Sequence, residues 1–193
     1  LRCCVRIQPL ETVHISFSTA VAHSSEEAIR LADKYHDISI FEREAALAWT
    51  RSQVEMRHLN IAPESAFLFQ RLAAQILYSD LSLRARPGLL ALNTKAQSDL
   101  WAYGIGGDLP IVLVRINRAE DLPLVRQLLN GHEYLRLKGL TFDLVILNNN
   151  PPGQMQSLHD ELTRFVRTSG EANLLDTNGG IFLKRADHIP EAD

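Results

Sequence analysis

The fold is decided by two aliphatic stretches, Pro110-Ile111-Val112-Leu113-Val114-Arg115-Ile116 and Phe142-Asp143-Leu144-Val145-Ile146-Leu147. Both are short, rich in β-branched residues and bounded by turn residues, which is typical of buried strands. A helix is predicted between them over about residues 121–138, with Gly139 as its stop. Another helix is predicted over about residues 155–170, and a third strand over residues 181–184. This order predicts a small three-stranded parallel βαβαβ module.

The amino-terminal residues have a different pattern, in which apolar and polar residues alternate along two runs. The apolar members are Cys3, Val5, Ile7, Val13, Ile15, Phe17 and Val21, with a turn around residues 9–11. An alternation with a period of two residues predicts the two antiparallel strands of a β-hairpin. An isolated hairpin is only marginally stable in water. We therefore expect the hairpin to belong to a larger β domain that lies mostly before Leu1. The alternative is a hairpin packed on the chain's own helices.

The stretch between the hairpin and the α/β module is predicted to be helical. Ser24 followed by Glu27 has the spacing of a capping box, and Ser39 with Glu42 repeats it. Pro63 suits the first turn of a third helix. The apolar residues of these helices recur at three- and four-residue spacing, which indicates a packing face rather than a cofactor site.

Composition excludes several classes of protein. The chain has 193 residues, 46% of them hydrophobic, and a formal net charge of -3, which argues against a nucleic-acid-binding surface. No apolar run approaches the ~20 residues that a membrane-spanning helix needs. The two cysteines, Cys3 and Cys4, are neighbours that cannot easily bridge, so a reducing compartment is expected.

Motifs for cofactors and catalysis are absent from the sequence. The glycines at positions 104, 106 and 107 precede a strand, whereas a phosphate-binding loop must follow one. The histidines and cysteines lack metal-ligand spacing, and no nucleophile elbow occurs. Asp108, Glu133 and Asp143 have apolar neighbours, and a structural role is favoured for each. We expect no cofactor, no metal and no catalytic residue in this chain.

Two segments are candidates for carbohydrate binding. Trp101 and Tyr103 lie beside flexible glycines and Asp108, so flat rings could stack on a sugar while the acid bonds to its hydroxyls. Asn148 and Asn149 follow the second strand, at the edge where open α/β sheets bind ligands. For each segment a structural role, as an interface filler or a polar turn, is favoured over binding.

The longest of these motifs resembles the cyclic β-1,2-glucan synthases. It reads Gln97-Ser98-Asp99-Leu100-Trp101-Ala102-Tyr103-Gly104-Ile105-Gly106-Gly107-Asp108-Leu109-Pro110 and continues to residue 116. Residues 32–35, 67–73, 124–127, 132–134, 136–140, 143–148 and 179–183 are similar to the same family. The chain departs from the family pattern at Gly106, Leu135 and Asn149, where Ser, Trp and Glu are usual.

The resemblance implies a segment of a large, multi-domain bacterial inner-membrane glycosyltransferase. Such proteins make β-1,2-glucan from UDP-glucose and have a carboxyl-terminal part similar to cellobiose and chitobiose phosphorylases. Residues 1–23 would then be the last strands of a β-sandwich, residues 24–95 a helical linker, and residues 96–193 a small α/β module, giving a mixed α/β fold class. No catalytic residue of the family is carried over to a position of this chain.

Three functions are consistent with the sequence. The favoured one is a non-catalytic scaffold on the cytoplasmic face of the inner membrane, with other domains of the same polypeptide as partners and no membrane insertion of its own. The second is an accessory module that binds β-1,2-glucan through Trp101, Tyr103, Asp108, Asn148 and Asn149. The third, a stand-alone α/β enzyme, lacks a persuasive set of catalytic groups.

Overall fold

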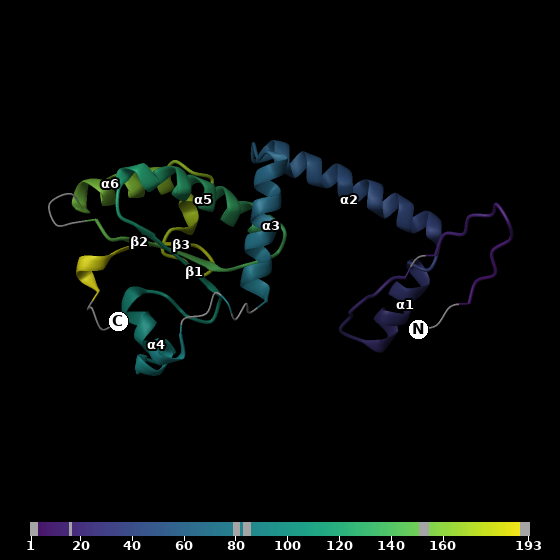
Figure 1. Cartoon of the computed structure of the whole chain (residues 1–193), viewed down its shortest axis with the longest axis horizontal. Helices are drawn as coiled ribbons and strands as arrows, with labels where there is room; N and C mark the ends of the chain where they lie inside the picture. The colour runs from purple at the N-terminus through teal and green to yellow at the C-terminus, as the bar shows by residue number, and fades with distance from the viewer. Residues whose placement is uncertain (1–3, 16, 79–81, 83–85, 151–154, 190–193) are drawn as a thin grey trace. The chain divides into compact units, whose positions relative to one another are not determined.

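The computed structural model describes residues 4–15, 17–78, 82, 86–150 and 155–189 (Figure 1). Cys3, and residues 151–153 of the loop that begins at Asn148 and was a candidate for carbohydrate binding, lie outside this range. The chain divides into two compact units, Leu1–Arg57 and His58–Asp193, and each is considered by itself. Among the described helices, none combines the length and apolar character needed to cross a bilayer.

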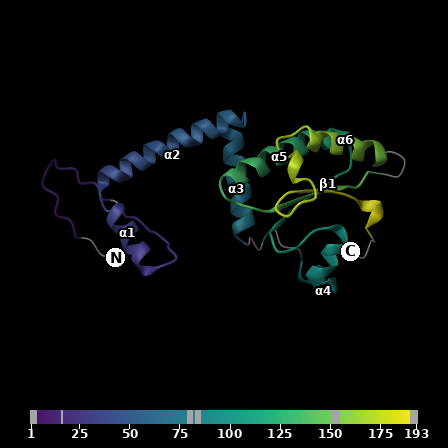
Figure 2. The ribbon, with the colours of Figure 1, turned by 180° about the vertical axis from the view of Figure 1, so that it is seen from behind.

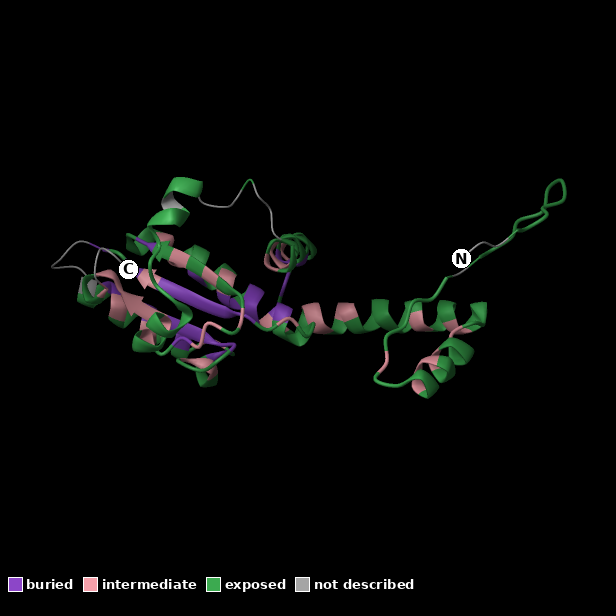
Figure 3. Ribbon diagram, turned by 90° about the horizontal axis from the view of Figure 1, so that it is seen from below, coloured by how far each residue is buried: buried purple, intermediate pink, exposed green. Residues whose placement is uncertain are grey.

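The predicted hairpin over residues 1–23 does not form paired strands in its described part. A turn is present at Pro9 and Leu10, as predicted. The apolar side chains on either side of the turn remain exposed, and Phe17 reaches 67% exposure (Figure 3). The structure therefore corrects the prediction of strands here. The physical reason is that a two-stranded ribbon gains too little burial when nothing covers its apolar side.

Helix α1 (Ser25–Lys34) begins where the sequence predicts it. The Ser24 hydroxyl accepts a hydrogen bond from the Glu27 N–H at 3.2 Å, which satisfies one of the unpaired amides of the first turn. Acidic residues in the first turn and Lys34 in the last turn complement the helix dipole. Local capping and charge thus define this helix, because none of its residues is buried.

Helix α2 (Ile38–His58) is capped differently from the prediction. Ser39 lies inside the helix, and the carboxylate of Asp37 accepts the Ser39 N–H at 2.9 Å. Hydrogen bonds from Ser39 hold the pKa of Asp37 below its usual range. A charged carboxylate at a helix N-terminus is favoured by the dipole as well as by the hydrogen bond, which explains why Asp37 replaces Ser39 as the cap.

The second unit is built on a three-stranded parallel sheet. Strands β1 (Ile111–Ile116), β2 (Asp143–Asn148) and β3 (Ile181–Arg185) pair in the order β1-β2-β3. Helix α5 (Leu122–Leu137) connects β1 to β2, and helix α6 (Met155–Arg167) connects β2 to β3. Both helices cover the same face of the sheet (Figure 1, Figure 2). The predicted βαβαβ module and the mixed α/β fold class are confirmed.

The remaining elements are short, apart from one helix. They are α3 (Pro63–Leu77), α4 (Pro87–Leu92) and the 3-10 turns η1 (Gln97–Tyr103), η2 (Ala119–Asp121), η3 (Ala172–Leu174) and η4 (Ala186–His188). Pro63 occupies the first turn of α3, as predicted. Gly104 ends η1 with φ +73°, a left-handed conformation that suits glycine. Gly139 follows α5 with φ +85°, which confirms the predicted stop.

The main core lies between the sheet and the two crossover helices. Most of its almost completely buried side chains are aliphatic; these include Ile116, Val125, Leu129, Leu144, Ile146, Leu162, Val166 and Ile181. Full burial of one such side chain stabilises the fold by roughly 1.5–3 kcal/mol. Parallel strands with continuous aliphatic runs are therefore held by this single layer of helix-on-sheet contacts.

Helix α3 lies within the predicted helical linker but packs on α5 of the α/β module. Phe69 of α3 is buried, and its ring lies 5.8 Å from that of Tyr134, centroid to centroid. Gly131 allows this approach, because a Cβ at that position would lie 2.9 Å from Cδ1 of Phe69. The close contact, rather than a turn, is the reason for glycine in the middle of a helix.

The substitution Gly131→Ala tests this contact. Helix propensity alone predicts a gain of about 1 kcal/mol, because glycine is unfavourable inside a helix. We expect the opposite, a loss of about 1–3 kcal/mol, because the methyl group overpacks against Phe69. Urea unfolding measures the free energy of unfolding of the variant and of the parent chain. Gly88→Ala is the control, because a Cβ at Gly88 meets nothing within 4 Å. A Gly131→Ala variant as stable as the parent chain would contradict the contact.

Candidate functional site

The face of the sheet opposite α5 and α6 is only partly covered. Ile105 packs over Val145 and Phe182, and Leu100 and Tyr103 of η1 adjoin this small cluster. No described residue covers the β1 side of the same face in this way, and Ile111 and Leu113 are 41% and 53% exposed. An aliphatic parallel strand is normally buried on both faces, so this exposure distinguishes β1 from β2 and β3.

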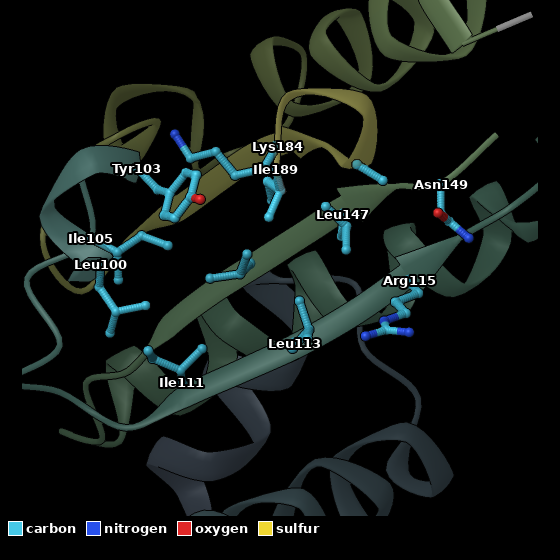
Figure 4. A pocket seen from close by; sticks show the side chains of 12 residues that line it. Leu100, Tyr103, Ile105, Ile111, Leu113, Arg115, Leu147, Asn149, Lys184 and Ile189 are labelled. Atoms are coloured by element: carbon cyan, nitrogen blue, oxygen red, sulfur yellow. The ribbon is translucent and has the colours of Figure 1, made fainter. Parts of the chain in front are cut away.

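A groove of about 590 Å³ runs over this open face (Figure 4). Its floor is formed by alternate residues of the strands, which the register places on one side of the sheet. The lining residues are Leu100, Tyr103, Ile105, Ile111, Leu113, Arg115, Val145, Leu147, Asn149, Lys184, Ala186 and Ile189. Most are aliphatic, and no carboxylate is among them.

Two polar side chains of the groove, Arg115 and Asn149, lie toward the carboxyl ends of β1 and β2, whereas Tyr103 and the amine of Lys184 lie nearer η1 (Figure 4). Ile111 lies at the opposite end of the groove from Arg115. Lys184 forms an ion pair with Asp176, with Nζ 3.1 Å from Oδ1. Arg115 is exposed and forms no ion pair with any described residue. The groove is thus an apolar strip with, at one end, a positive charge that forms no ion pair among the described residues.

The predicted carbohydrate-binding residues do not all converge on the groove. Tyr103 and Asn149 line it. Trp101 is 65% exposed outside the lining, and its indole N–H donates to the Gly106 carbonyl at 3.2 Å. Asp108 accepts a bond from Asn178, on a loop that precedes β3. Asn148 is completely buried.

Asn148 and Asn149 have separate structural partners. The side-chain oxygen of Asn148 accepts the Asn150 N–H at 3.1 Å, which stabilises the turn after β2. The amide of Asn149 donates to the Asn117 side-chain oxygen at 3.0 Å and thereby joins the loops after β2 and β1. Complete burial makes Asn148 inaccessible to a sugar in this structure, whereas Asn149 remains at the end of the groove.

A buried ionic cluster, which no local sequence pattern indicates, connects α5 to the loop before η3. The Nδ1 atom of His132 lies 2.6 Å from Glu171 Oε2, and Nε2 lies 3.1 Å from the carbonyl oxygen of Phe142. Arg136 donates to Glu171 Oε1 at 2.7 Å. Each imidazole nitrogen thus lies within hydrogen-bond distance of an oxygen acceptor.

Two opposing effects determine the pKa of Glu171. Burial raises the pKa of Glu171, but hydrogen bonds from His132 and Arg136 lower it by more, so the pKa lies below its usual range. The carboxylate therefore stays charged with two partners inside the fold. All three side chains bond to one another or to the backbone, which is the arrangement of a structural tie rather than of a free acid–base pair.

Asp143 at the start of β2 is buried with one oxygen unsatisfied. Its Oδ1 accepts the Gly179 N–H at 2.7 Å, whereas Oδ2 has no hydrogen-bond partner in the part of the chain that the structure describes. Burial raises the pKa of Asp143, and the negative charge of Asp108 acts in the same direction. Across the described ranges, no group of three or more His, Cys, Asp or Glu side chains could hold a metal ion.

The sequence is similar to part of a known protein. No family model matches the sequence. The chain is 39% identical over 162 residues to the cyclic beta-(1,2)-glucan synthase NdvB of Rhizobium meliloti (strain 1021). This chain is homologous to a segment of a cyclic β-1,2-glucan synthase. The match covers 84% of this chain and 6% of NdvB, so the chain spans a small part of its relative's length.

The resemblance predicted from the sequence is therefore confirmed. The match extends over most of the chain rather than over one motif. It supplies no residue roles, so Trp101, Tyr103, Asp108, Asn148 and Asn149 stay predictions as carbohydrate contacts.

The substitution Glu171→Gln tests the ionic cluster. We expect a loss of about 3–5 kcal/mol at neutral pH, because His132 loses its charged partner inside the fold. Since the folded pKa of Glu171 lies below its usual value, its stabilising contribution is present above about pH 4.3 and is lost as the pH falls through the folded pKa. In urea unfolding between pH 3 and pH 7, the free energies of unfolding of the variant and the parent chain should therefore approach each other as the pH falls.

The matched control for this variant is Asp176→Asn, which removes an exposed ion pair with Lys184. A partly exposed pair contributes about 0–1 kcal/mol, so we expect little change. An equal loss in both variants, or a Glu171→Gln loss independent of pH, would be inconsistent with a buried charge cluster.

The substitution Asp143→Asn should have the opposite pH dependence. Because the folded pKa of Asp143 is raised, its contribution to stability is full below its ordinary value of about 3.9 and is lost as the pH rises through the folded pKa. The variant should therefore be more stable than the parent at pH 7, by about 1.4 kcal/mol for each unit of the raised pKa. Urea unfolding over the same pH range measures the difference in free energy of unfolding between the two proteins. A difference that does not change with pH would contradict a raised pKa of Asp143 in the fold.

Proposed function

We propose that this chain is a non-catalytic scaffold segment of a cyclic β-1,2-glucan synthase. In that protein it would join a β-sandwich to a phosphorylase-like region and hold their relative orientation. The homology to NdvB supports the parent protein, which we infer to be a bacterial inner-membrane glycosyltransferase that uses UDP-glucose. We infer that the segment lies on the cytoplasmic side, with other parts of the same polypeptide as its partners.

The observation that carries the scaffold role is the exposed aliphatic half of the sheet. Ile111 and Leu113 lie on the edge strand β1, next to the mostly buried strand β2, and their exposure leaves a hydrophobic surface in contact with water. A surface of this kind is typical of a contact between domains. The exposed apolar side chains of residues 4–15 and 17–23 support the same interpretation for the first unit.

The arrangement of the polar groups also favours a scaffold over an enzyme. His132 and Glu171 are engaged with each other and buried, and Asp143 is completely buried at the start of its strand. Substrate does not reach groups in such positions. The accessible groups of the groove, Arg115 and Lys184 among them, lack a neighbouring carboxylate or nucleophile in the groove lining that would complete a catalytic set.

The second candidate function, binding of β-1,2-glucan, has one specific observation in its favour. Tyr103 and Asn149 line the same groove, and an aromatic ring with an amide is a common combination for contacting a sugar. The rest of the floor is aliphatic, however, and it offers few donors or acceptors for sugar hydroxyls. The scaffold is therefore the better supported of the two functions.

Two measurements on the 193-residue chain separate the functions. The scaffold predicts no transfer from UDP-glucose and no phosphorolysis of β-1,2-glucan above a heat-denatured control. It also predicts no change in tryptophan fluorescence when β-1,2-glucan fragments are added to millimolar concentration. Turnover in either assay would overturn the non-catalytic role, and a saturable fluorescence change abolished by Tyr103→Ala would favour the binding module.

A further inference from the structure

We propose that the open half of the sheet face is the docking site of an α-helix from elsewhere in the same synthase polypeptide, with an apolar stripe and an acidic residue that meets Arg115. This inference rests on the proposed scaffold function and specifies its partner. The open half is the exposed part of the groove formed by Ile111, Leu113, Arg115 and Leu147.

The dimensions of the surface suit a single helix. Adjacent strands lie about 4.8 Å apart, so the strip over β1 and β2 is roughly the width of one helix, about 10 Å across. The six residues of β1 extend about 20 Å, which a helix of about 13 residues would span. Parallel sheets are normally covered by helices on both faces, and here α5 and α6 cover only one.

The charge of the groove indicates the chemistry of that helix. Arg115 lies at one end of an apolar strip, is exposed, and has no ion pair within the described residues. Lys184 already has Asp176 as a partner. When a helix covers the strip, it removes water from around Arg115, so an unpaired guanidinium there would be costly. A carboxylate on the docking helix, toward the carboxyl ends of the strands, offsets that cost.

Two other occupants are less suited to this surface. A second copy would pair the face with itself, because a two-fold interface brings together the same patch from both protomers. The groove lining has no carboxylate, so a second copy would bring no acid to Arg115 from that lining. Helix α4 has exposed apolar residues, Leu90 and Leu92, but its sequence also contains no acidic residue.

A site-specific cross-link in the intact synthase tests the proposal. A photoreactive benzoylphenylalanine replaces Leu113, and the same residue replaces Leu137 of α5, which is similarly exposed at 42%, as the matched control. After irradiation in native membranes, peptide mass spectrometry identifies the attached segment. We expect position 113 to cross-link within the same polypeptide, to a helical segment with apolar residues at three- and four-residue spacing and an Asp or Glu near one end.

The charge requirement is tested by a second pair of variants. Arg115→Glu should lower the yield of the cross-link from position 113 by about fivefold, because it sets like charges against each other, whereas Arg115→Lys should retain most of it. Arg118→Glu, on the loop that follows β1, is the control for a change of charge outside the groove lining and should leave the yield unchanged. These readouts do not depend on the catalytic activity of the synthase.

Several outcomes would contradict the proposed docking of a helix. Position 113 could give no cross-link, or it could cross-link to lipid, to a second copy or to α4. Position 137 could cross-link to the same segment with an equal yield, or Arg115→Glu could leave the yield from position 113 unchanged. Failure of the proposed function is a different result, namely turnover by the 193-residue chain. The chain could be catalytically silent while another surface mediates docking, so the two failures are distinguishable.

Discussion

The structure depends on how the three parallel strands are shielded from water. Helices α5 and α6 cover one face of the sheet, and the aliphatic side chains between them and the strands are almost completely buried. On the other face, Ile105 and η1 cover Val145 and Phe182, whereas Ile111 and Leu113 of β1 remain exposed. Crossover connections that run in one direction across a sheet place their helices on the same face, so the other face needs cover from outside the βαβαβ module.

A second set of contacts, between polar side chains, lies near the start of β2. His132, Glu171 and Arg136 join α5 to the loop before η3, and they are fully engaged with one another. Asp143 is the exception, because one of its oxygens is buried without a partner among the described residues. The fold therefore contains one buried charge that stabilises it and one that opposes it, with opposite dependence on pH.

Much of the second unit could be predicted from the sequence, because its signals are local. Continuous aliphatic runs predict the strands, Gly139 predicts the end of α5, and Ser24 predicts the start of α1. The cap of α2 was missed because Asp37 and Ser39 are both good caps, and the spacing to Glu42 favoured the wrong one. The hairpin over residues 1–23 was predicted from alternation alone, which gives a strand's pattern but not the partner that stabilises it.

The features of the candidate site could not be predicted for a different reason. Glu171 and His132 are 39 positions apart, and no local pattern indicates that they pair. Leu113 and Val145 belong to equally aliphatic strands, yet one is exposed and the other is covered by Ile105. Only the sheet order and the path of η1 separate them.

The most direct measurement is an electron cryomicroscopy structure of the intact synthase that contains this segment. The account predicts helical density packed over Ile111 and Leu113, with a carboxylate beside Arg115. Solvent or lipid over that half of the sheet, with the module otherwise unchanged, would contradict it.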